Sequence, residues 1–243
     1  MNPMASNEQD RGLVHMDALF LSPHKFPGGV CTPGILVAKK FLFNRRLPPC
    51  QPGGGTVEFV TDQDQQYLSK VSHREESGTP DIVGCIRAGL VFQLKHAVTP
   101  ELIESLERNL YIKAVQRLSK NPRIHIVGQL TQPANKSFDG VSHVVNRLPT
   151  LSFVVYHQSG KLLHYNFVCA LLDNLFGIQS RGGCVCAGPY GEHLLSMDTE
   201  LAKLYEEQLT RYDDVEVIRP GFVRLSLAYF ITPEEADYVL DAI

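Results

Sequence analysis

This sequence of 243 residues lacks long apolar runs, and it has little excess of charge of either sign. No stretch of 18 apolar residues occurs, so we expect no transmembrane helix. The polar segment of residues 1–12 also lacks the apolar core of a signal peptide. The net charge is only −3, and it gives no electrostatic reason to expect nucleic acid or an anionic membrane as a partner.

Cysteine is present, but its spacing fits neither a zinc site nor a secreted disulfide framework. The six cysteines are Cys31, Cys50, Cys85, Cys169, Cys184 and Cys186. No two of them form a CxxC pair, so we predict no metal site. We expect reduced thiols in a cytoplasmic protein, and an organelle matrix fits the same pattern.

Apolar residues recur with both strand and helix periods, which predicts a mixed α and β fold. Short apolar or alternating runs predict strands at residues 18–21, 34–38, 124–128, 151–155 and 222–230. Helical spacing predicts helices at residues 82–97, 99–119, 163–176 and 192–212, and a last one from residue 232. We expect Thr79 and Pro80 to be the N-cap and first-turn proline of the first helix, and Gly177 to follow the third.

A lysine follows the first predicted strand, in the segment Ser22-Pro23-His24-Lys25. An amine that is partly removed from water is more readily neutral, and a neutral amine can form a Schiff base. For one lysine considered alone, an exposed position on a loop is the simpler interpretation.

Five blocks of sequence, in order along the chain, change that interpretation. They are residues 22–37 (SPHKFPGGVCTPGILV), 53–56 (GGGT), 76–80 (ESGTP), 181–189 (RGGCVCAGP) and 224–235 (RLSLAYFITPEE). Together they resemble the class V aminotransferase and cysteine desulfurase family, although Phe230-Ile231 departs from the pattern of the last block. The resemblance covers roughly residues 17–243. It implies an enzyme dependent on pyridoxal phosphate (PLP) with fold type I.

The resemblance implies an α/β fold in which a partial large domain, with a mixed and mostly parallel sheet, precedes a smaller α+β domain. Residues 1–98 would be the C-terminal part of the PLP-binding domain, residues 99–122 a connecting helix, and residues 123–243 the small C-terminal domain. The aspartate that faces the pyridine nitrogen in this family precedes the lysine, and neither Asp10 nor Asp17 lies in a matching context. We therefore expect an incomplete large domain with exposed apolar surface. For this chain alone we expect weak or absent PLP binding and a tendency to associate or aggregate.

The resemblance also assigns cofactor contacts. Lys25 would form the Schiff base with PLP and act as general base. Ser22 and His24 would contact the phosphate, which their hydroxyl and imidazole groups suit. Thr79 would reach the phosphate in the partner subunit's site, which implies a homodimer. Each of these residues also has a purely structural interpretation: Ser22 as a turn residue, His24 as a solvated histidine and Thr79 as an ordinary N-cap.

The last two blocks supply candidate substrate and sulfur contacts. Arg224 would bind the substrate α-carboxylate through its guanidinium fork, with Arg181 assisting. A surface salt bridge is the alternative for both. Cys186 occupies the position of the sulfur-accepting cysteine in one branch of cysteine desulfurases, and an inert buried thiol is the alternative. Cys184 would either resolve a persulfide as a disulfide or only pack.

Three functions remain open from the sequence. The first is PLP-dependent transformation of an amino acid, with a cysteine desulfurase-like reaction as the favoured case. The second is another reaction of the family, such as that of an aminotransferase, an epimerase or a kynureninase-like lyase. The third is a truncated, catalytically incomplete fragment that acts only as a binding or regulatory partner.

Overall fold

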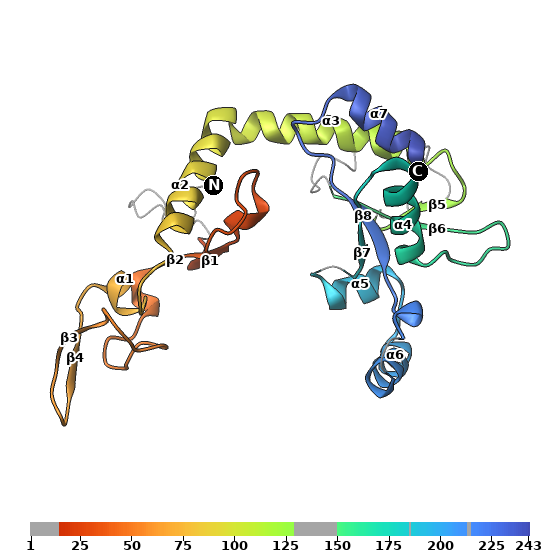
Figure 1. Ribbon diagram of the computed structural model, residues 1–243. Helices are drawn as coiled ribbons and strands as arrows, with labels where there is room; N and C mark the ends of the chain where they lie inside the picture. The colour runs from red at the N-terminus through yellow and green to blue at the C-terminus, as the bar shows by residue number, and fades with distance from the viewer. Residues whose placement is uncertain (1–14, 129–149, 185, 213–214) are drawn as a thin grey trace. The chain divides into compact units, whose positions relative to one another are not determined.

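The computed structural model describes residues 15–128, 150–184, 186–212 and 215–243 (Figure 1). The chain divides into two compact units, Met1–Thr99 and Pro100–Ile243. Asp10 lies outside the described residues. Within the described ranges, no helix combines the length and the apolar character that a membrane span requires.

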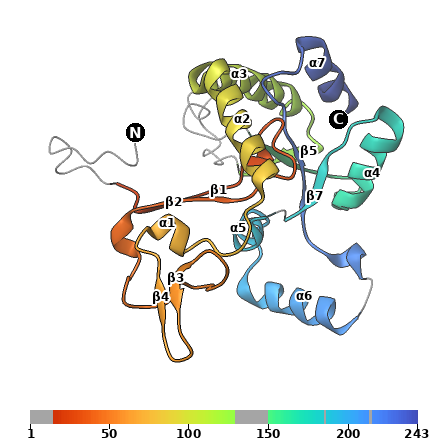
Figure 2. The same ribbon diagram turned by 60° about the vertical axis from the view of Figure 1, so that its left-hand side comes forward.

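The first unit is built from two hairpins and a helix. Strands β1 (Ala18–Leu21) and β2 (Ile35–Ala38) run antiparallel, side by side in Figures 1 and 2. The other elements of this unit are η2 (Pro23–Lys25), η3 (Lys40–Leu42), β3 (Val57–Val60), β4 (Gln65–Tyr67), α1 (Val71–Arg74) and α2 (Ile82–Val98). Strands β3 and β4 form the second antiparallel hairpin.

The start of α2 differs from the sequence prediction. Its N-cap is Asp81, whose side chain accepts a hydrogen bond from the Gly84 N–H at 2.9 Å, and Thr79 lies exposed two residues earlier. The prediction of Thr79 as N-cap was therefore wrong. Asp81 has a carboxylate in reach of the first-turn N–H groups, and aspartate is at least as good an N-cap as threonine.

Every strand pair in the described residues is antiparallel. The mostly parallel sheet expected of the large domain is thus not found among them, and this detail of the prediction is corrected. A parallel pair needs a crossover connection, usually a full helix. Residues 22–34, which join β1 to β2, contain only the short turn η2, so the chain folds back on itself.

The second unit is a four-stranded antiparallel sheet with helices. The strand order is β5 (Ile124–Ile126), β6 (Leu151–Val155), β8 (Phe222–Leu225) and β7 (Arg181–Gly183). The helices are α3 (Pro100–Leu118), α4 (Tyr165–Phe176), α5 (Gly188–Leu194), α6 (Thr199–Arg211), η4 (Glu216–Ile218) and α7 (Pro233–Ala242).

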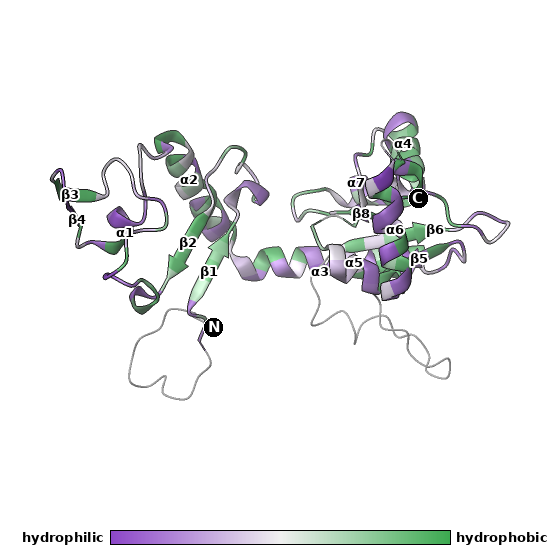
Figure 3. Ribbon diagram, turned by 90° about the horizontal axis from the view of Figure 1, so that it is seen from below, coloured by the Kyte–Doolittle hydropathy of each residue, from purple (hydrophilic) through white to green (hydrophobic). Residues whose placement is uncertain are grey.

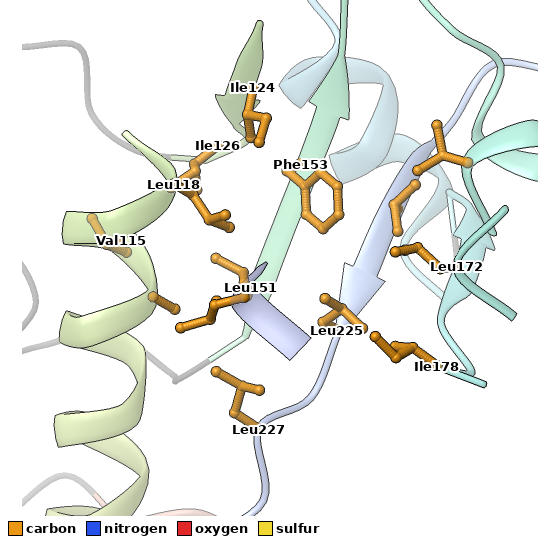
Figure 4. Packing of buried hydrophobic residues seen from close by; sticks show 14 of the residues in the cluster. Val115, Leu118, Ile124, Ile126, Leu151, Phe153, Leu172, Ile178, Leu225 and Leu227 are labelled. Atoms are coloured by element: carbon orange, nitrogen blue, oxygen red, sulfur yellow. The ribbon is translucent and has the colours of Figure 1, made fainter. Parts of the chain in front are cut away.

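The main hydrophobic core lies between this sheet and helices α3, α4 and α7. Figure 4 shows Val115 and Leu118 of α3 pointing toward Phe153 of β6, which is fully buried. Successive side chains of a strand point to opposite faces. Val154 accordingly belongs to a second, smaller cluster with Val127 and Phe222.

Most predicted elements of this unit are found, with two corrections. The predicted helix at residues 192–212 is two helices, because Ser196 has a positive φ of 57° and Asp198 caps α6 anew. The predicted strand at residues 222–230 ends at Leu225, where its pairing with β6 and β7 stops. The last helix begins as predicted, with a capping box between Thr232 and Glu235.

Candidate functional site

The turn η2 holds the predicted cofactor-binding residues of the first unit. The Lys25 N–H donates to the Ser22 carbonyl at 3.0 Å, and Pro23 between them is buried. A Cβ at Gly29 would collide with the Pro23 carbonyl oxygen, so the chain can close this turn only with glycine there. His24 and Lys25 lie on the exposed side of the turn.

The residue after Lys25 fastens the turn to α2. The Phe26 ring meets the Phe92 ring edge to face, with 5.4 Å between the centroids. The Lys95 ammonium lies 4.7 Å from the centroid of the Phe26 ring. These aromatic and cation–π contacts fix the backbone on which Lys25 is displayed.

The donors on this turn fit two ends of PLP. The primary amine of Lys25 can react with the aldehyde. The hydroxyl of Ser22 and the imidazole of His24 can donate hydrogen bonds to the phosphate. Two acids of the first unit, one before the turn and one before α2, have other partners. Asp17 forms an ion pair with Lys39 at 2.7 Å, and Asp81 caps α2. The residues of this turn thus fit the aldehyde and the phosphate, and residues 22–29 include no carboxylate that could face the pyridine nitrogen.

The glycine blocks of residues 53–56 and 76–80 are joined. The Gly78 N–H donates to the Gly54 carbonyl at 2.8 Å. The buried hydroxyl of Thr56 donates to the Gly53 carbonyl at 2.6 Å and closes the first block on itself. Thr79 directly follows Gly78, and its side chain is exposed close to the N-terminus of α2.

Two arginines lie opposite each other in the sheet of the second unit. Arg181 of β7 and Arg224 of β8 are Cα partners, and Arg224 is also opposite Ser152 of β6. Directly opposed residues project from the same face, and like charges in such a pair repel. Arg224 has no ion-pair partner in the described part of the chain. An anion bound between the two guanidinium groups would relieve this repulsion.

The exposed thiol of Cys186 lies beside one of these arginines. Arg181 Nη2 donates to the Cys186 sulfur at 3.3 Å. A cation at hydrogen-bond distance stabilises a thiolate, which is the nucleophilic form of cysteine. All six cysteines are among the described residues, and none of them forms a disulfide.

Cys184 has a different environment, although it is only two residues away. Its sulfur donates to the Pro220 carbonyl at 3.4 Å. Burial, followed by the negative charge of Glu192, raises the pKa of the Cys184 thiol. The side chain also packs closely against Gly191 of α5. Of the two roles left open for Cys184, the packed and protonated thiol is the one that these contacts favour.

A polar network near Cys184 was not predicted from the sequence. The Tyr165 hydroxyl donates to Glu216 Oε1 at 2.7 Å, and Arg219 Nε donates to Glu216 Oε2 at 2.6 Å. Burial and the hydrogen bond to Glu216 raise the pKa of Tyr165, whereas the bonds from Tyr165 and Arg219 lower the pKa of Glu216. Two signals in the sequence point to this network: the glycines around β7, which leave room for a ring, and the polarity of Tyr165 and Asn166 at the predicted helix start.

The predicted residues therefore form two groups. Ser22, His24 and Lys25 share one turn of the first unit, and Thr79 lies elsewhere in that unit, before α2. Arg181, Arg224 and Cys186 lie together on β7, on β8 and after β7 in the second unit.

Comparisons with known proteins identify relatives of the chain. The family model for class-V aminotransferases matches residues 4–239. A cysteine desulfurase of Escherichia coli O139:H28 is 29% identical over 231 residues, which make up 92% of this chain and 45% of that protein. A cysteine desulfurase of Shigella flexneri is 29% identical over 223 residues, or 91% of this chain and 43% of that protein. The chain spans about half the length of the curated relatives it matches.

Two solved structures share its fold. The apo cysteine desulfurase of Thermococcus onnurineus has a TM-score of 0.66 at 24% identity, covering 93% of this chain and 46% of that one. An Escherichia coli cysteine desulfurase in an S-sulfonic acid form has a TM-score of 0.64 at 22% identity, covering 93% of this chain and 45% of that one. These similarities confirm the predicted α/β fold class of PLP enzymes.

Proposed function

The chain belongs to the class-V aminotransferase family, and from this premise we propose that it contributes to an enzyme that uses PLP to remove sulfur from cysteine. The hydrogen bond from Arg181 Nη2 to the sulfur of the exposed Cys186 is the observation that carries the proposal. The curated relatives named above are cysteine desulfurases, and the alternative of a purely regulatory fragment is not favoured.

Substrate binding is assigned to the opposed arginines. The α-carboxylate of the amino acid would accept hydrogen bonds from Arg224 and Arg181, whose side chains leave the same face of the sheet. A guanidinium fork matches the two oxygens of a carboxylate, and the bound anion removes the repulsion between the two cations. The Arg181–Cys186 contact then keeps the thiol next to the carboxylate site.

Cofactor binding is assigned to the first unit. Lys25 would hold the aldehyde carbon of PLP through its amine, and Ser22 and His24 would hold the phosphate. When bound, PLP supplies an electron sink for the substrate α-carbon. Lys25 would move the proton at that carbon as general base. The exposed Thr79 would serve the phosphate of a partner subunit's site, so the proposal includes a homodimer.

Sulfur transfer is assigned to Cys186. Its thiolate attacks the sulfur of the substrate cysteine, which forms a sulfur–sulfur bond and breaks the bond between that sulfur and the substrate β-carbon. The electron pair of the broken bond stays with the carbon, and a proton added there yields alanine. Cys186 is left as a persulfide, and no external oxidant is consumed.

The test is to detect a persulfide on Cys186. The protein is incubated with excess PLP and cysteine, alkylated, digested and analysed by mass spectrometry. We expect one added sulfur on the Cys186 peptide of the wild type, its loss in Cys186→Ser, and its retention in the matched control Cys184→Ser. Full turnover by Cys186→Ser would instead indicate an aminotransferase-like reaction without a sulfur-accepting thiol.

Cofactor binding has a separate test. The absorbance spectrum of the protein mixed with PLP should contain a band that is missing from Lys25→Ala. Lys70→Ala is a matched control, because that lysine is exposed and its ammonium has only His73 as a hydrogen-bond partner in the described residues. A band that survives in Lys25→Ala, or that disappears equally in both variants, contradicts the assignment of Lys25.

A further inference from the structure

The ring of Tyr165 occupies a slot that three glycines leave open. A Cβ added to Gly182 would collide with Tyr165 Cδ2, and one added to Gly221 would lie 2.7 Å from Tyr165 Cε1. Gly183 lies against the same ring, and its φ of +96° is itself suited to glycine. The slot joins the first residue of α4 to β7 and to the segment before β8.

The far end of the ring is tethered. The Tyr165 hydroxyl donates to Glu216 Oε1 at 2.7 Å, and Arg219 holds the other oxygen of that carboxylate. The raised pKa of Tyr165 keeps the hydroxyl protonated, so the donor persists over the ordinary working range of pH. A buried hydroxyl with a charged acceptor is a strong and directional restraint.

The segment fixed in this way carries the proposed sulfur chemistry. Gly182 directly follows Arg181, the donor to the Cys186 sulfur. Gly221 directly follows Pro220, whose carbonyl accepts from Cys184. A shift of the Tyr165 ring would therefore move both segments that set where the two cysteines lie: β7 and residues 220–221 before β8.

We propose that Tyr165 is a positioning residue for Cys186: its ring in the glycine slot, and its hydroxyl on Glu216, hold β7 so that Arg181 stays against the Cys186 sulfur. The inference rests on the proposed function, because it gives a purpose to the placement of that thiol. Tyr165 itself contacts neither the Cys186 sulfur nor the opposed arginines in any described hydrogen bond.

The experiment measures the reactivity of the Cys186 thiol against pH. The rate of alkylation by iodoacetamide is followed by mass spectrometry of the Cys186 peptide, which requires neither PLP nor substrate. Arg181→Gln gives the profile without the arginine contact. Tyr165→Phe keeps the ring and removes only the tether. Tyr156→Phe is the matched control, since its hydroxyl has no hydrogen-bond partner among the described residues.

In Tyr165→Phe we expect the profile to move to higher pH, toward that of Arg181→Gln. Below the wild-type midpoint, alkylation should be roughly three- to tenfold slower, the range that loss of one hydrogen bond corresponds to. Tyr156→Phe should keep the wild-type profile. A wild-type profile in Tyr165→Phe overturns the inference, and so does an unshifted profile in Arg181→Gln.

A second variant separates positioning from simple electrostatics and does not alter the buried ring. The charged and titratable groups on the elements around the two thiols are Arg181 of β7, Arg224 of β8, Glu192 and His193 of α5, and Glu216 and Arg219. Glu216→Leu removes both the acceptor of the tether and the negative charge, and loss of the charge would by itself favour the thiolate and move the profile to lower pH. Loss of the tether moves it to higher pH, which is the result we expect. A downward shift overturns the inference.

The outcomes for placement and for function are distinct. A shifted alkylation profile in Tyr165→Phe, together with no persulfide on the wild type, would leave the positioning role standing while the desulfurase proposal fails. A persulfide on the wild type with no change of profile in Tyr165→Phe would support the desulfurase proposal and overturn the positioning role of Tyr165.

Discussion

The two units of the chain differ in where their apolar side chains lie. In the first unit, Ala88 and Val91 of α2 are the buried hydrophobic residues among those described, although Figure 3 shows hydrophobic stretches on β2 and α2. In the second unit, one continuous cluster joins α3, α4 and α7 to the sheet. The outer side of α2 instead exposes 46–66% of each of the residues Ile82, Val83, Ile86, Leu90 and Leu94.

This difference shows how each unit is stabilised. Burial of a leucine or isoleucine side chain contributes about 1.5–3 kcal/mol, and the second unit gains this many times over. The first unit depends more on polar anchors. Arg74 is 2% exposed and donates to the Asn44 and Leu47 carbonyls.

A core truncation and a surface truncation together give the strongest test of this difference in apolar burial. Phe153→Ala should lower the free energy of unfolding by about 3–5 kcal/mol, because it opens a cavity in the packed core. Ile86→Ala should change it by less than about 0.5 kcal/mol, because that side chain is 62% exposed. Urea unfolding followed by circular dichroism measures both. Equal losses would mean that another surface covers α2.

Loss of the buried cation Arg74 tests whether the first unit depends on polar anchors. Arg74→Met should destabilise the first unit by about 2 kcal/mol, because the carbonyls of Asn44 and Leu47 lose a charged donor. The effect should be local, so faster proteolysis within residues 44–55 is the measurement. The control is Arg87→Met, whose side chain donates to only one carbonyl, that of Val30. Unchanged cleavage in Arg74→Met would contradict the anchoring role.

The two helix caps form a smaller test. Thr232→Ala removes the capping box of α7 and should cost about 1 kcal/mol, visible as a lower urea midpoint of the second unit. Asp81→Ala removes the cap of α2 at a similar cost. If the first unit lacks a cooperative core, that loss should appear only as reduced helix content. A shift of the main transition by Asp81→Ala would show that α2 unfolds together with the second unit.

The smallest expected effect concerns pH. Hydrogen bonds from Tyr165 and Arg219 lower the pKa of Glu216 in the folded protein. A lowered pKa contributes stability above the ordinary range of a glutamate, and this contribution is lost as pH falls through the folded value. The difference in urea midpoint between wild type and Glu216→Gln should therefore shrink on acidification below that range. A difference that grows with acidity would contradict the assigned network.

Local patterns in the sequence predicted individual elements well. The apolar run of residues 151–155 is β6, and the capping pattern at Thr232 begins α7. Gly177 ends α4 in the left-handed conformation. Periodicity did not reveal the break at Ser196, because apolar residues continue with helical spacing on both sides of it. The short strand β7 has two glycines, which by themselves indicate no strand.

The sequence by itself determined the family, through five ordered blocks, and most helices and strands, through spacing and caps. Those signals are local, since each depends on residues within a few positions of one another. Only the tertiary structure decided that Arg181 lies opposite Arg224 and against Cys186, and that Tyr165 fills a slot of three glycines. Strand register and close packing bring together residues at separations from five positions (Arg181 and Cys186) to more than forty (Arg181 and Arg224), and the spacing along one chain does not specify these contacts.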